Sequence, residues 1–75
     1  MGNADCQAKI LALERIIQKN KNGISLKRML CELDNQYGIR AERKSIYRNI
    51  DILTRFMPIN MKRKGETILY YLEEL

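Results

Sequence analysis

The residues best suited to chemistry lie in the segment RKSIYRNIDIL, residues 43–53. At about 100° per residue in a helix, one stripe of this segment carries three branched apolar residues: Ile46, Ile50 and Leu53. The opposite face carries two cations, Lys44 and Arg48, and a third cation, Arg55, continues this face just beyond the segment. Ser45 and Tyr47 lie on the flanks between the two faces. Such a helix fits the major groove of DNA, where cations and hydroxyls meet phosphates and base-edge acceptors.

A solvated amphipathic helix would show the same stripe, so the distribution of charge along the chain matters. The 75 residues carry a net charge of +5, which is uneven: residues 1–39 hold +2, residues 40–64 hold +6 and residues 65–75 hold −3. Positive charge concentrated on one segment is typical of a surface that binds a polyanion. The same segment includes a second basic group: Lys62, Arg63 and Lys64.

The first element that positions these side chains is a helix from about Asp5 to Asn20. Its apolar stripe is predicted to consist of three residues: Ile10, Leu13 and Ile17. Asn3 or Asp5 is expected to cap its start, and Asn22-Gly23 to end it in a left-handed conformation.

A second and a third helix should follow closely. Ile24 is expected to form a strand stub of one or two residues, and Ser25 to cap the second helix. The core stripe of that helix is predicted to be Leu26, Met29, Leu30, Leu33 and Tyr37, with Gly38 after its end. The third helix is predicted to run from about Glu42, a poor capping residue, to Phe56-Met57, because Pro58 disfavours helical geometry before it.

After Pro58 the apolar period changes from helical to alternating. Residues 59–64 and 67–72 predict a hairpin of two strands of about five residues, with its tip at Lys64-Gly65 or Gly65-Glu66. The expected fold class is therefore mainly α with a small β-hairpin (α+β). It is a winged helix-turn-helix of three helices followed by a two-stranded wing, in one domain over residues 1–75. The basic wing, residues 59–72, is placed to reach phosphates or the minor groove.

Composition argues against several other classes. The chain has no His, and Cys6 and Cys31 match no zinc-ligand spacing, so we expect no metal, no cofactor and no enzymatic activity. Cys31 is expected to be a buried or half-buried small residue. Residues 1–6 lack the basic and apolar regions of a signal peptide, and no apolar run approaches the roughly 20 residues that span a bilayer, so we expect a cytoplasmic protein without a membrane partner.

Residues 43–53 resemble the recognition-helix motif RKTIYRDI-x-x-L of bacterial winged-helix regulators that carry a C-terminal WYL domain. The likeness extends to Tyr37-Gly38-Ile39 before the motif and Pro58-Ile59 after it, and it covers most of residues 10–72. Three departures from the family pattern are Asn49 and Glu42, each in place of Asp, and the absence of Gly from Arg55-Phe56-Met57. The exit from the third helix is therefore expected to differ from that of the family.

The resemblance implies that the motif helix enters the major groove and that an attached sensor domain mediates regulation and oligomerisation. The chain would then be the N-terminal domain of a longer regulator, able to form a homodimer through the missing domain, or else a free-standing small regulator. Neither case predicts a small molecule bound to this domain.

The function expected from the sequence is sequence-specific binding of double-stranded DNA by a bacterial transcriptional regulator, with the helix over about 42–56 in the major groove. The candidate DNA-binding residues are Arg43, Lys44, Ser45, Tyr47, Arg48, Lys62, Arg63 and Lys64. The alternative is a winged-helix protein-interaction module that docks on an acidic partner, since such a surface would attract the same cations.

Overall fold

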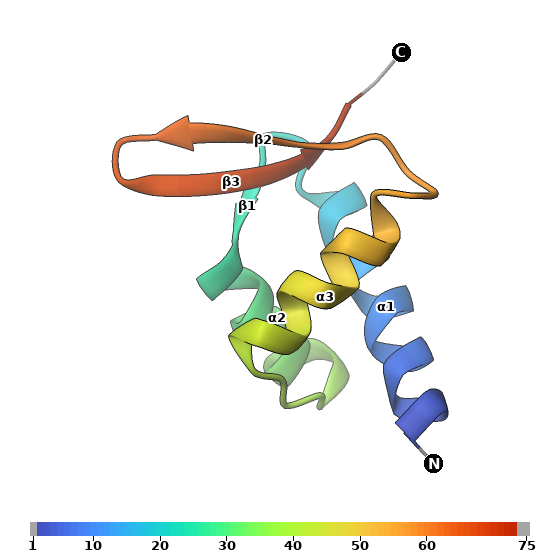
Figure 1. Ribbon diagram of the computed structural model, residues 1–75. Helices are drawn as coiled ribbons and strands as arrows, with labels where there is room; N and C mark the ends of the chain where they lie inside the picture. The colour runs from blue at the N-terminus through green and yellow to red at the C-terminus, as the bar shows by residue number, and fades with distance from the viewer. Residues whose placement is uncertain (1, 74–75) are drawn as a thin grey trace.

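The computed structural model describes residues 2–73, with side chains from Gln7 to Glu73, as three helices and a three-stranded sheet (Figure 1). The elements in chain order are α1 (Gly2–Lys19), β1 (Ile24–Ser25), α2 (Leu26–Tyr37), α3 (Arg43–Leu53), β2 (Ile59–Lys64) and β3 (Thr67–Leu72). The helices pack together below the sheet, and the turn between α2 and α3 lies at the end of the molecule opposite the sheet (Figure 1). This order confirms the predicted three helices followed by a hairpin.

Helix α1 is longer at its start than the sequence predicted. It already includes Asn3 and Asp5, so neither residue precedes the helix as a cap, and their side chains lie outside the described part. Leu13 and Ile17 are buried as predicted. After the helix, Gly23 has the expected left-handed backbone, with φ of 106°.

Helix α2 confirms the prediction from its capping residues. The Ser25 hydroxyl accepts from the backbone N–H of Arg28 at 3.3 Å, and Gly38 ends the helix in a left-handed conformation. Met29 and Leu33 are buried, with the other predicted stripe residues packed around them. Cys31 is a correction, because it is exposed and free. It lies about 160° around the helix from both Met29 and Leu33, and so points away from the core.

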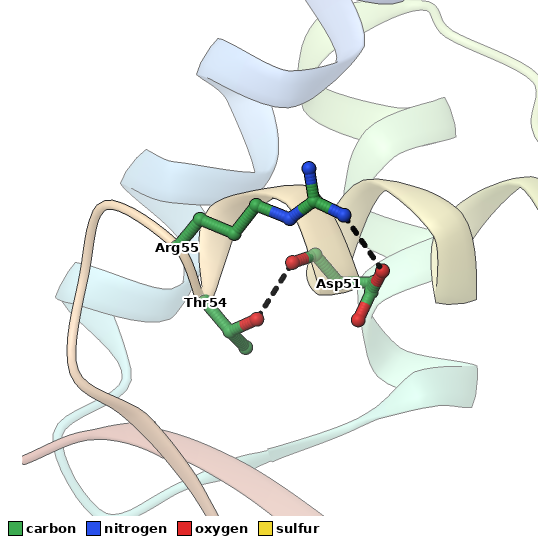
Figure 2. Close-up of polar contacts among 3 residues, drawn as sticks. All are labelled: Asp51, Thr54 and Arg55. Atoms are coloured by element: carbon green, nitrogen blue, oxygen red, sulfur yellow. Dashed lines mark hydrogen bonds and ion pairs between the residues drawn. The ribbon is translucent and has the colours of Figure 1, made fainter.

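Helix α3 ends at Leu53 rather than at Phe56-Met57, which corrects the predicted range. The Thr54 hydroxyl donates to the Asp51 carbonyl at 2.6 Å, and Arg55 reaches back to the Asp51 carboxylate (Figure 2). The next backbone bonds, from Arg55 to Ile52 and from Phe56 to Leu53, span three residues instead of four. This tighter spacing closes the helix end before Pro58 and turns the chain toward β2.

The sheet has three antiparallel strands in the order β1-β3-β2, so the expected two-stranded wing gains a strand. The stub Ile24-Ser25 was predicted, but its pairing with Tyr70 and Leu69 of β3 was not. This pairing joins residues more than 40 positions apart in sequence, a relation that local periodicity does not encode. The hairpin tip is Gly65-Glu66, one of the two predicted positions.

One apolar core holds the helices and the sheet together. Its fully buried side chains come from all three helices: Leu13, Ile16, Ile17, Met29, Leu33 and Ile46. Tyr70 of β3 and Ile24 of β1 extend the same core to the sheet. The core therefore fixes the base of the hairpin against the helices, which sets where the hairpin projects relative to α3.

Candidate nucleic-acid interface

Helix α3 presents the two faces that its sequence predicted. Ile46, Ile50 and Leu53 are buried against the rest of the core. On the opposite side, Lys44 and Arg48 are exposed one turn apart. Because the buried stripe fixes the rotation of the helix, it also fixes the direction in which these cations point.

The two hydroxyl-bearing residues on the flanks of α3 have different environments. Tyr47 is 53% exposed and points toward the sheet side, where it lines a hollow together with Met61 and Tyr70. Ser45 is half-buried, and its hydroxyl accepts a hydrogen bond from the ammonium of Lys9 on α1 at 2.5 Å. Lys9 was not among the predicted site residues, and a contact across 36 positions leaves no signal in the sequence.

Asn49 is the other residue of α3 that sequence reasoning missed. It is 3% exposed, the one polar residue among those buried in the described part of the chain. At about 60° from Ile46 on the helical wheel, it lies beside the apolar stripe. Its position on the wheel could have predicted this burial. The burial makes Asn49 part of the support for α3 and not part of its exposed face.

The three basic residues of the wing are divided between its two faces. Residues opposite one another in the hairpin share a face, and the pairs here are Lys62 with Leu69, Arg63 with Ile68 and Lys64 with Thr67. Met61 and the buried Tyr70 line a hollow with Tyr47 of α3, and Arg63 and Ile68, two positions further along their strands, share the same face of the hairpin. Lys62 and Lys64 are on the other face, where the Lys62 ammonium lies 5.3 Å from the centre of the Tyr71 ring. The cationic cluster predicted at the wing is therefore not a single surface.

A hollow of about 340 Å³ separates α3 from the wing. Its walls come from the start of α2, the first half of α3 and the wing: Ser25, Leu26, Lys27, Arg43, Tyr47, Glu66, Thr67, Ile68 and Tyr70. The hollow thus brings together two of the predicted site residues, Arg43 and Tyr47. It also includes Lys27, a cation that the sequence did not single out.

None of the cations of this surface has a carboxylate within ion-pair distance in the described part of the chain, although Glu66 lines the same hollow as Arg43 and Lys27. Across the described side chains, the one ion pair is Asp51 with Arg55, at 4.0 Å, and both partners are largely exposed (Figure 2). The pair includes none of the predicted DNA-binding residues. It leaves each of the predicted cations without a carboxylate within 4.0 Å among residues 7–73: Arg43, Lys44, Arg48, Lys62, Arg63 and Lys64.

Tyr70 joins the wing to α3. Burial raises the pKa of its hydroxyl above the ordinary value of 10.0, and the neighbouring hydroxyl of Tyr47 adds to the effect. The Tyr70 hydroxyl is therefore neutral near pH 7. Within the described part of the chain, no three metal-ligating side chains come together.

No protein-family model, curated protein or solved structure matches the chain. In the part of the chain that the structure covers, no helix combines the length and apolar character needed to cross a bilayer.

Proposed function

We propose that the protein binds double-stranded DNA, with α3 in the major groove and the wing beside it. The observation that carries this proposal is the row of exposed cations on α3, held outward by a buried apolar stripe and without a carboxylate within 4.0 Å among the described side chains. Fixed positive charge of this kind attracts the DNA backbone and releases its counterions. The predicted order of helices and hairpin, and the resemblance of residues 43–53 to a bacterial regulator motif, support a role in transcriptional regulation.

The side chains divide into readers of bases and contacts to phosphates. Arg48 lies one turn into α3 on its exposed pole, so we assign to it a bidentate contact with guanine O6 and N7. Lys44, one turn earlier, and Arg43, at the hollow beside the wing, are assigned to phosphates. On the wing, Arg63 lies on the face of the hairpin that is turned toward α3, so we assign a phosphate contact to it as well.

The proposal is tested by titrating the protein against a labelled duplex of mixed sequence at several salt concentrations. With the three phosphate contacts assigned above, the logarithm of the association constant should fall with the logarithm of salt concentration at a slope of about −3 or steeper. The variant Lys44→Gln should make that slope shallower by about one. Polyglutamate at equal charge serves as the competitor that imitates an acidic protein surface. Absence of duplex binding at low salt, or displacement of the duplex by polyglutamate, contradicts the proposal and favours the protein-interaction module.

A further inference from the structure

We propose that Lys9, Arg40 and Ser45, here called the Lys9 cluster, form a second phosphate-binding surface near the end of the molecule opposite the wing. The inference rests on the proposed DNA-binding function and extends its footprint. Arg40 lies in the turn between α2 and α3, which Figure 1 places at the other end of the molecule from the hairpin. Lys9 comes from α1, an element that the sequence assigned only to the core.

The first support is the hydrogen bond between Lys9 and Ser45. The Lys9 ammonium donates to the Ser45 hydroxyl oxygen, and both residues are half-buried. A lysine ammonium has three N–H donors, so two remain for other acceptors. Because the Ser45 oxygen already accepts from Lys9, its own O–H is free to donate. The pair therefore offers donors to an incoming group, which suits the acceptor-only oxygens of a phosphate.

The second support is the hollow that Lys9 shares with Arg40. This hollow measures about 380 Å³, and its other lining residues are Ala8, Gly38 and Ile39. No carboxylate lines it, and neither Lys9 nor Arg40 has an ion-pair partner among the side chains that the structure includes. Two cations beside one hollow, from elements distant in sequence, concentrate positive potential there. A phosphodiester carries the charge and the acceptor oxygens that match this surface.

The position of the Lys9 cluster explains why the partner would be the backbone of the same duplex. The major groove is about 12 Å wide and is bordered by one backbone strand on each side. The wing and the Lys9 cluster lie toward different ends of the molecule, with α3 between the hairpin and the turn before it (Figure 1). With α3 in the groove, the wing would hold one strand and the Lys9 cluster the other.

The test compares variants on one mixed-sequence duplex across salt concentrations. Lys9→Gln and Arg40→Gln should each reduce the magnitude of the salt slope by about 0.9, and the double variant by about 1.8. Ser45→Ala should weaken binding without changing the slope, because it removes a neutral donor. The matched control is Lys19→Gln, an exposed lysine about 15 Å further along α1, which should leave affinity and slope unchanged. Thermal unfolding verifies folding, and Lys9→Met replaces Lys9→Gln if the latter unfolds.

The outcomes separate this inference from the proposed function. If the unaltered protein binds the duplex with a steep slope and the double variant keeps that slope, the Lys9 cluster does not contact phosphate, while the proposed function stands. If the unaltered protein does not bind duplex DNA at low salt, the proposed function fails and this inference fails with it.

Discussion

Gly23 lies against Leu69 so closely that a β-carbon added at residue 23 would come within 2.9 Å of the Leu69 β-carbon. The aliphatic end of Lys62 is on the same side, at 3.4 Å from that position. The turn after α1 is therefore pressed onto the face of the hairpin that points away from α3. Together with the pairing of β1 and β3, this contact holds the base of the wing in place.

We expect Gly23→Ala to destabilise the fold by about 2 kcal/mol or more. A side chain at φ of 106° costs about 1–2 kcal/mol by itself, and the close approach to Leu69 adds to it. The matched control is Gly65→Ala at the hairpin tip, where φ is 64° and no atom lies within 4 Å, so only the conformational cost remains. Urea unfolding of both variants measures the difference. Equal losses at the two positions would show that the packing against Leu69 carries no energy.

The facing of α3 is tested by Ile50→Ala. Ile50 is buried, so its truncation leaves a cavity and should cost about 2–4 kcal/mol, a large part of the stability of a small domain. Ile52→Ala, two residues along and only partly buried, should cost less. Chemical unfolding curves give both values. An unfolding midpoint unchanged by Ile50→Ala would mean that α3 does not turn Ile50 toward the core.

Tyr70 should make stability depend on pH in the alkaline range. Its raised pKa in the folded state means that folding favours the neutral hydroxyl. The stability that the neutral Tyr70 hydroxyl contributes is fully present below the unfolded-state pKa of 10.0. It is lost as the pH rises through the higher pKa of the folded state. The free energy of unfolding should therefore fall more steeply above pH 10.0 for the unaltered protein than for Tyr70→Phe. Parallel curves for the two proteins would contradict this assignment.

Local sequence signals predicted the elements well because each rests on neighbouring residues. The cap at Ser25 and the stop at Gly38 depend on contacts within a few positions, and the stripe of α3 shows in the spacing of neighbouring apolar residues. The early end of α3 was missed because Pro58 limits how far a helix can extend and does not fix its last residue. The switch to three-residue bonds after Thr54 decides that end.

The candidate site was less predictable because it depends on contacts between distant segments. Alternation along a strand already places Arg63 on the face opposite to Lys62 and Lys64, but which of the two faces meets α3 follows from the packing of the hairpin, which places Tyr70 inward. The hydrogen bond from Lys9 to Ser45 follows from the packing of α1 beside α3. Neither the facing of the hairpin nor the contact of Lys9 with Ser45 appears in the spacing of residues along the chain.

The central claim, that α3 reads base sequence while the wing holds the backbone, is tested most directly by comparing Arg48→Ala with Arg63→Ala. The measurement is the affinity of each variant for a duplex selected from a random library with the unaltered protein, and for a scrambled duplex. We expect Arg48→Ala to cost about 1–3 kcal/mol on the selected duplex and much less on the scrambled one. Arg63→Ala should weaken both to a similar degree. Equal losses for Arg48→Ala on both duplexes, with a change of specificity only for Arg63→Ala, would contradict the account and make the wing the reader of sequence.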